Sequence, residues 1–366
     1  MVLAYYITIF AISLICCTFY YWKARKYYSV LYAMVFVLAF LSQLCYVLLA
    51  FSRDINEALT IYKFLYIGGC YLPLVGLFLV FSICKIELPK WVRFLLLLFT
   101  TFIFGLVLTS GNNQLFYKSV ELEVRNGVAV LVKDYGPLHI LFYIEIGLYL
   151  VATFFALIYG WVKKPNVSRR NLVVAALMQM FSIFAFFIGR AITKDIEWMA
   201  LADLVDEIGF LIVVDSIGLY RVDDLVSSSL LKEGQVGYIS LDFKKRYLSA
   251  TDIAKRFLPE IAKNHADRAI EDTKIRELFD NWIEDFKRKN VSKKHTYRKG
   301  EYIFSIRVRD LYDGKKKRGY LIEISDDTAH QRHMEGIERY NKNLNQELKV
   351  KTDLIRKLRE QKKKTG

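Results

Sequence analysis

The chain has 366 residues, of which 54% are hydrophobic and 24% charged, and its formal net charge is +15. Up to residue 220 it holds 17 Lys/Arg and 13 Asp/Glu, and the remainder holds 35 and 24, so most of the positive charge lies in the second part. We see no nucleic-acid recognition motif and expect no nucleic-acid partner, whereas a basic domain beside an anionic leaflet makes membrane lipid an expected partner.

Seven apolar stretches fill the first 220 residues. They cover about 2–22, 28–52, 58–84, 91–110, 137–162, 169–189 and 197–220. A helix that crosses the hydrocarbon core needs about 20 mainly apolar residues, and soluble helices show a polar face that residues 94–104 lack. The predicted fold is therefore an all-α seven-helix transmembrane bundle, followed by a cytoplasmic α+β domain and a C-terminal coiled-coil helix.

Basic residues in the short loops set the orientation. They cluster after the first, third and fifth stretches, as Lys23, Arg25, Lys26, Lys85, Lys90, Arg93, Lys163, Lys164, Arg169 and Arg170. Lys and Arg in short loops mark the cytoplasmic side, so we expect the N-terminus outside and the C-terminus in the cytoplasm. The first stretch lacks a basic n-region and is expected to be retained. All five cysteines lie inside the stretches and predict apolar packing, with no disulfide or metal site.

Polar residues collect in the outer half of the predicted bundle. An ionisable group at membrane depth faces the bundle interior or a cavity, and the spacing of three acids in the last stretch places them on one helix face. The candidate ligand-binding residues are Gln43, Tyr46, Tyr62, Tyr66, Glu145, Arg190, Asp203, Asp206 and Glu207. Interfacial anchoring, structural ion pairing and a proton or ion pathway are the alternatives. Because acids outnumber bases, a ligand with a cationic or donor-rich group is expected.

Residues 117–135 form one long outside loop with strand-like alternation on both sides of Asn126-Gly127. That dipeptide between alternating runs predicts a β-hairpin, because both turn positions need φ > 0. A two-residue turn places five apolar residues on one face, namely Val120, Leu122, Val124, Ala129 and Leu131. An isolated hairpin is marginal in water, so we expect this face to rest on the mouth of the bundle, as a lid or as a structural plug.

Tyr135-Gly136-Pro137 enters an aromatic-rich stretch, and Ile217-Gly218-Leu219-Tyr220-Arg221-Val222-Asp223-Asp224-Leu225 leaves the last one. Over about residues 1–226 the chain resembles the bacterial seven-transmembrane sensor region at the N-terminus of many histidine kinases and cyclic-dinucleotide enzymes. The resemblance implies a receptor in the bacterial inner membrane that senses an extracellular small molecule. It carries over no catalytic residues.

Residues 232–329 resemble a PAS domain. Residues 237–242 alternate as a strand, 302–309 and 320–325 form a hairpin-like pair, and Asp326-Asp327-Thr328 matches the Asp-x-Thr signature that couples PAS domains to an exit helix. The resemblance implies that Asp326 and Thr328 relay the signal. The charged helical segment at about 261–290 departs from a compact PAS core, and we expect no bound cofactor.

Residues 330–366 predict a helix with a short apolar heptad seam, to which Ile337, Leu344, Leu348, Ile355 and Leu358 contribute. Such a seam favours a parallel dimer, so we expect a homodimer through the PAS-like domain and the coil. A solvated surface helix is the alternative.

The sequence stops where an output domain would ordinarily begin, and it shows no kinase phosphoacceptor box, ATP-binding glycine pattern or cyclic-dinucleotide motif. We therefore expect no enzymatic activity in this chain and expect the output, a kinase or a cyclic-dinucleotide enzyme, to be absent from it or supplied by a partner. A membrane transporter or channel with a cytoplasmic regulatory domain is the alternative function.

Overall fold

The computed structural model describes residues 1–23, 29–164, 167–193, 196–217, 236–289, 294–313 and 316–364. They form two compact units, one helical and one built around a sheet. The junction motif runs from Ile217 to Leu225, and all of it after Ile217 lies outside the described residues.

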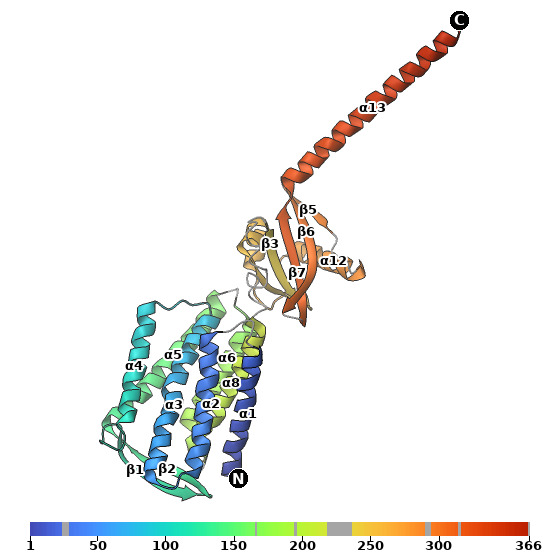
Figure 1. Cartoon of the computed structure of the whole chain (residues 1–366). Coiled ribbons are helices and arrows are strands. Elements are labelled where there is room, and N and C mark those ends of the chain that lie inside the picture. The colour runs from blue at the N-terminus through green and yellow to red at the C-terminus, as the bar shows by residue number, and fades with distance from the viewer. Residues whose placement is uncertain are drawn as a thin grey trace. The chain divides into compact units, whose positions relative to one another are not determined.

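Long helices at the seven predicted positions make up the helical unit (Figure 1). They are α1 (Val2–Lys23), α2 (Val30–Phe51), α3 (Ile55–Ile83), α4 (Lys90–Leu108), α5 (Ile140–Lys163), α6 (Arg169–Phe184) and α8 (Trp198–Ile217). A 3-10 turn, η1 (Pro137–His139), precedes α5, and a π-helical turn, η2 (Ala185–Gly189), and the short α7 (Arg190–Ile192) follow α6.

Six of the described helices are long and apolar enough to cross a membrane. The seventh, α8, is not among the six, although its 20 residues have sufficient length. It carries four acids, Asp203, Asp206, Glu207 and Asp215, which reduce its apolar character. The structure therefore bears out six apolar spans and leaves the seventh crossing as a proposal.

Local signals fix where two of these helices begin. The Asp54 carboxylate accepts hydrogen bonds from the backbone N–H groups of Asn56 and Glu57 at the start of α3, and the Ser168 hydroxyl accepts one from Asn171 at the start of α6. These caps satisfy N–H groups that have no partner within the helix. In α3, Pro73 has no N–H, so the usual bond to the carbonyl four residues earlier cannot form.

A glycine permits the close approach of α2 and α3. A Cβ atom added at Gly68 would lie 1.8 Å from the Oγ and 3.2 Å from the Cβ of Ser42 on α2. The Ser42 hydroxyl already donates to the Leu38 carbonyl of its own helix (3.1 Å). Small residues let helix backbones approach closely where no hydrophobic force drives association in lipid. Gly68 is therefore a packing position.

The loop between α4 and α5 forms the predicted hairpin, which lies across one end of the bundle (Figure 1). β1 (Tyr117–Arg125) pairs antiparallel with β2 (Val128–Tyr135), and the turn residues Asn126 and Gly127 have φ of 51° and 79°. This end of the bundle is called the hairpin end below.

Only part of the expected apolar face packs on the bundle. Ala129 and Leu131 are buried and Val120 and Leu122 are partly buried against the bundle, whereas Val124 of β1 is 76% exposed. The expectation was wrong for Val124, because β2 packs more closely on the bundle and leaves the turn end of β1 outward.

The second unit is a five-stranded antiparallel sheet with helices. Its strands are β3 (Val236–Asp242), β4 (Tyr247–Ala250), β5 (His295–Lys299), β6 (Tyr302–Asp313) and β7 (Lys316–Asp326), in the order β4-β3-β7-β6-β5. Its helical elements are α11 (Asp252–Phe257), η4 (Pro259–Lys263), α12 (Thr273–Lys289) and α13 (Thr328–Lys364), and α13 leaves the sheet as one long helix (Figure 1).

The charged segment that was expected to depart from the core contributes to it instead. Phe279, Trp282 and Ile283 of α12 are buried in the same apolar cluster as Ile306 and Ile322 of the sheet. The segment is amphipathic, and its apolar face covers the sheet while its charges face outward.

The α2–α3 contact gives a testable consequence. Gly68→Leu forces a side chain into the Ser42 backbone region, and we expect it to lower the unfolding free energy by about 1–3 kcal/mol, the usual cost of overpacking. Gly105→Leu on α4 is the matched control, because a Cβ atom there meets nothing within 4 Å. Thermal unfolding of the purified chain in lipid nanodiscs measures both; equal midpoints for the two variants would contradict the packing role.

Candidate ligand-binding cavity

A cavity of about 220 Å³ lies inside the helical unit and reaches the hairpin. Side chains from α1, α2, α3, α5, α6, α8 and β2 line it. Five of the nine predicted site residues are among them, namely Tyr46, Tyr62, Tyr66, Asp203 and Asp206. Residues far apart in the sequence thus meet around one space.

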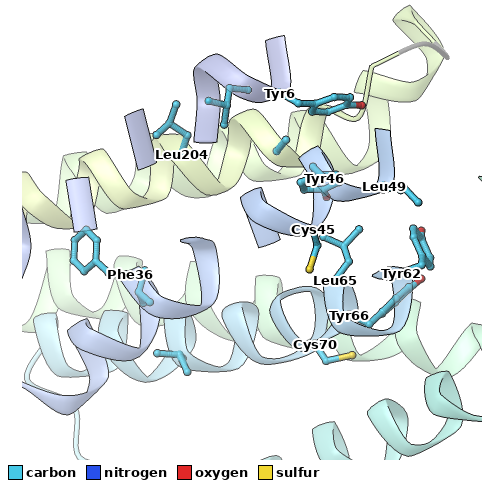
Figure 2. Close-up of a cluster of buried hydrophobic side chains, with 14 of the residues drawn as sticks. Tyr6, Phe36, Cys45, Tyr46, Leu49, Tyr62, Leu65, Tyr66, Cys70 and Leu204 are labelled. Carbon is cyan, nitrogen blue, oxygen red and sulfur yellow. The ribbon is translucent and has the colours of Figure 1, made fainter. Parts of the chain in front are cut away.

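Tyrosines form the wall near the hairpin. The Tyr6 and Tyr46 rings are stacked with centroids 5.8 Å apart, and the Tyr62 and Tyr66 rings meet edge to face at 5.3 Å. Figure 2 shows these four side chains grouped toward one end of the buried cluster. The hydroxyls of Tyr66 and Tyr117 lie 2.6 Å apart, which joins α3 to β1.

Lys133 of β2 is a cavity residue that the sequence analysis missed. Its ammonium group donates a hydrogen bond to the Tyr62 hydroxyl and lies 4.1 Å from the centroid of that ring. The register pairs Lys133 with Val120, which places it on the same hairpin face as Leu131. That alternation is the signal that could have identified it, because side chains two residues apart share a face.

Three carboxylates line the cavity against this single lysine: Glu197, Asp203 and Asp206. The Ser182 hydroxyl of α6 donates to Asp206 at 3.4–3.5 Å, a long hydrogen bond between α6 and α8. Within the described ranges, no hydrogen bond or ion pair reaches the carboxylate of the half-buried Asp203. Among the lining residues that the structure describes, acids outnumber bases, which favours a cationic guest.

The start of α8 is held by the first helix. The Glu197 backbone N–H donates to the Tyr6 hydroxyl (3.1 Å), and the Tyr5 hydroxyl donates to the Glu197 carbonyl (3.3 Å). These bonds place the acidic turn of α8 beside the tyrosine wall. Nowhere in the described chain does a cluster of His, Cys, Asp or Glu suit a metal ion.

Three predicted site residues are buried away from the cavity lining and bridge helices instead. The Gln43 amide donates to the Ala200 carbonyl (2.7 Å), which joins α2 to α8. The Thr100 hydroxyl donates to Glu145 (2.6 Å), and the Ser13 hydroxyl donates to Glu207 (2.8 Å). The second carboxylate oxygen of each glutamate has no hydrogen-bond partner among the described residues. The Arg190 side chain lies outside the described part of the chain.

The π-helical turn η2 borders the cavity through Ala185 and Phe186. A π turn inserts an extra residue into a helix, and such turns frequently occur at functional sites. Here it begins three residues after Ser182, so the helix that contacts Asp206 changes its winding within one turn of that contact.

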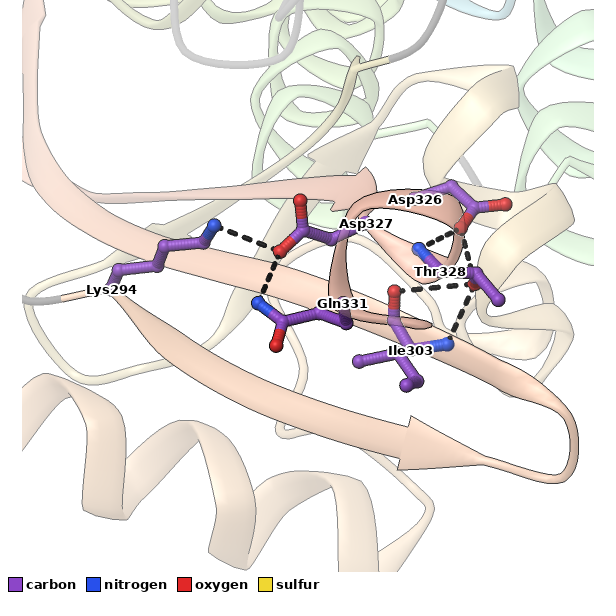
Figure 3. A network of polar contacts seen from close by, with 6 residues as sticks. All are labelled: Lys294, Ile303, Asp326, Asp327, Thr328 and Gln331. Carbon is purple, nitrogen blue, oxygen red and sulfur yellow. Dashed lines mark hydrogen bonds and ion pairs between the residues drawn. The ribbon is translucent and has the colours of Figure 1, made fainter. Parts of the chain in front are cut away.

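The predicted relay residues Asp326 and Thr328 form a joint at the start of α13 (Figure 3). The Thr328 hydroxyl accepts from the Ile303 backbone N–H of β6 (2.9 Å) and lies 2.5 Å from the Asp326 carboxylate, to which it donates. The Asp326 carboxylate also accepts from the Thr328 backbone N–H (2.9 Å). This joint fixes the first turn of α13 to β6.

A second set of contacts surrounds Asp327. Lys294 forms an ion pair with its carboxylate (2.8 Å), and the Gln331 amide donates to the same oxygen (2.8 Å), as Figure 3 shows. Partial burial raises the pKa of Asp327, but these hydrogen bonds and the lysine charge outweigh it, so the pKa lies below its ordinary value. Arg298 of β5 pairs with Glu335 one turn further along α13 (2.7 Å).

The buried bond to Glu145 can be tested on its own. Thr100→Val removes the hydroxyl that reaches Glu145 and Tyr149, so we expect the unfolding free energy in nanodiscs to fall by about 1 kcal/mol. Thr18→Val is the control, since that exposed hydroxyl donates to the Leu14 carbonyl of its own helix. A control variant that loses as much stability would argue against the bridging role.

The α13 joint makes a parallel prediction. Thr328→Val leaves the Ile303 N–H and the Asp326 carboxylate without their hydroxyl partner, and we expect a loss of about 1–2 kcal/mol in the stability of the sheet unit. Thr352→Val, on the exposed surface of the same helix, should leave stability unchanged. Hydrogen exchange of the β6 amides reports the difference, and unaltered protection in Thr328→Val would refute the joint.

A family model described as the N-terminal 7TM region of histidine kinase matches residues 6–214. No curated protein matches the chain. The match covers more than half of the chain, and the six apolar helices fall in the same part of it. The chain is therefore a multi-pass membrane protein that belongs to the family of N-terminal seven-transmembrane regions of histidine kinases.

Proposed function

We propose that this chain is the sensory part of a bacterial signalling receptor, in which an extracellular small molecule binds the cavity at the hairpin end and biases two arrangements of the helices. The observation that carries the proposal is the cavity itself, where tyrosines of three helices and the carboxylates Asp203 and Asp206 converge beneath β2. A ligand shifts an equilibrium only by its difference in affinity for the two states. A site built from several helices can provide that difference in affinity, because the shape of the site changes when the helices move relative to one another.

The site consists first of Tyr46, Tyr62, Tyr66, Asp203 and Asp206, which line the cavity. Gln43, Glu145 and Glu207 join it as a supporting shell that fixes the surrounding helices, and Arg190 remains a proposed member from its place after η2. The family supports a signalling role over the transporter or channel alternative.

The proposed topology has seven crossings in the bacterial inner membrane, with the N-terminus outside and the C-terminus in the cytoplasm. The family description supports seven spans, and α8 supplies the seventh helix. The connection between α3 and α4 lies at the end of the bundle opposite the hairpin (Figure 1), and its sequence contains Lys85. The positive-inside rule supports a cytoplasmic position for that end.

Beyond residue 226, we propose that the state of α8 passes to a PAS-like domain at 232–329, with Asp326 and Thr328 as the relay, and then to a coiled-coil helix at 330–366. The antiparallel sheet flanked by helices and the α13 joint support this assignment. Ile337, Leu344 and Leu348 are 40–53% exposed at heptad spacing on α13, which suits a homodimer.

The sensor region of this family is not catalytic, so the enzymatic output lies outside it. Membership of the family favours a histidine kinase as that output over a cyclic-dinucleotide enzyme. Lipid contacts the apolar outer surface, where side chains such as Phe94 and Leu98 of α4 are more than half exposed.

The test uses a protein in which this chain is followed by a histidine-kinase output. Asp206→Asn alters a cavity carboxylate that connects α6 to α8, and we expect basal autophosphorylation in membrane vesicles to change about fivefold, in line with a coupling of about 1 kcal/mol. Asp215→Asn is the matched control, since Asp215 lies on the same helix outside the cavity lining. Equal autophosphorylation in the wild type and both variants would exclude a sensory role for this cavity.

A further inference from the structure

The cavity is long as well as acidic. On α3 its lining includes one continuous stripe, made of Tyr62, Tyr66, Gly69, Pro73, Gly76 and Val80. These positions repeat every three or four residues, so they share one helix face. The stripe spans 18 residues, or about 27 Å at the rise of an α-helix. A compact guest would occupy a small part of such a space, whereas an extended one could follow it.

Polarity is divided along this length. The ionisable lining groups, Lys133, Glu197, Asp203 and Asp206, all lie toward the hairpin end of their elements. Beyond Gly69 the described lining carries no charged side chain and is mainly apolar, as at Leu77, with Tyr149 and Thr153 of α5 as polar members. The cavity therefore offers a charged head region and an apolar channel.

The head region favours a cation. Lys133 is already bound to the Tyr62 hydroxyl, and the carboxylate of Asp203 forms no hydrogen bond or ion pair within the described part of the chain. The stacked rings of Tyr6 and Tyr46 line the same region. Aromatic faces and a carboxylate together bind ammonium groups. A buried carboxylate in a membrane needs such a partner, because an unpaired charge there is costly.

One position in the wall of the apolar channel carries no side chain. A Cβ atom added at Gly76 meets nothing within 4 Å, although Gly76 is half-buried and lines the cavity. At Gly68, which also borders the cavity, the same atom would clash with Ser42. The missing side chain at Gly76 therefore leaves room in the apolar channel and provides a position where the channel can be filled without displacing a neighbouring helix.

We propose that the ligand of this cavity is an amphipathic organic cation, with an ammonium head beside Asp203 and the Tyr6–Tyr46 pair and an unbranched apolar chain that runs along α3 past Gly76. The inference rests on the proposed sensory function and specifies its ligand class.

The experiment measures binding of radiolabelled dodecylammonium to the 366-residue chain in phosphatidylcholine nanodiscs, with empty nanodiscs subtracted. Dodecanoate and dodecanol are the matched probes, because they keep the chain and change only the head. We expect saturable binding of dodecylammonium and at least about thirtyfold weaker binding to Asp203→Asn, the loss expected when a buried charge pair loses one partner. Tighter or equal binding of dodecanoate or dodecanol would overturn the cationic head.

The length of the site is tested with Gly76→Phe. This variant should abolish binding of dodecylammonium and leave the affinity for butylammonium within about twofold, since the short chain does not reach the filled channel. Gly105→Phe, on a glycine that also meets nothing within 4 Å but does not line the cavity, should bind both amines as the wild type does. Unchanged binding of dodecylammonium to Gly76→Phe would overturn the tail assignment.

Different experimental outcomes contradict the proposed ligand class and the proposed sensory function. If dodecanoate binds and Gly76→Phe blocks it, the cavity is a ligand site and only the cationic class is wrong. If none of the three probes binds, the amphipathic class is wrong, and the autophosphorylation of the Asp206→Asn variant then decides the sensory function by itself. Thermal unfolding of each variant verifies that it is folded before binding is compared.

Discussion

The structure of the helical unit depends on how carboxyl groups are accommodated inside an apolar bundle. A carboxylate moved away from water costs several kcal/mol unless hydrogen bonds or a cavity compensate it. Glu145 and Glu207 are fully buried, and each receives one hydroxyl hydrogen bond from a different helix, at Thr100 and Ser13 respectively. Each bond joins one pair of neighbouring helices, α4 with α5 and α1 with α8.

Asp203 and Asp206 are accommodated differently, since they border the cavity. The only hydrogen bonds to Asp206 from the described residues are the long ones from Ser182, at 3.4–3.5 Å, against 2.6–2.8 Å for the bonds to the two glutamates. Hydrogen bonds weaken as they lengthen beyond about 3.2 Å. Polar bonding therefore holds α8 firmly to α1 and weakly to α6, and the weak side is the side that carries the cavity and the π turn.

Hydropathy and turn chemistry predicted much of this fold because both are local. The bounds of the apolar helices follow from the length of apolar runs, and the hairpin follows from Asn126-Gly127. The expectation for the helical segment after residue 261 was wrong, because the many charges of this segment dominate its sequence. Its apolar face, with Phe279 and Trp282, becomes evident only when the sheet that this face covers is known. Lys133 was missed for the same reason: a lysine in a loop gains its role from the register that turns it toward Tyr62.

The spacing of the acids in the sequence did not predict which of them would line the cavity and which would bridge two helices. Asp203, Asp206 and Glu207 do share one broad face of α8, but Asp206 and Glu207 are successive residues and so about 100° apart on the helix. In a bundle, a helix has neighbours on both sides of such a face, and its two edges meet different partners. Glu207 consequently contacts α1, whereas Asp203 and Asp206 face the cavity.

That division makes α8 a suitable element for transmission. Its bond to Ser13 lies near the middle of the helix, 10 residues before Ile217, so rotation about the helix axis would break a buried hydrogen bond. A tilt about the Glu207 contact keeps that bond, but it strains the hydrogen bonds that hold the start of α8 to Tyr5, Tyr6 and Gln43. Under the proposed sensory function, a guest that draws Asp203 or Asp206 toward itself must therefore move α8 against these bonds, and Ile217 would move with it because it belongs to the same helix.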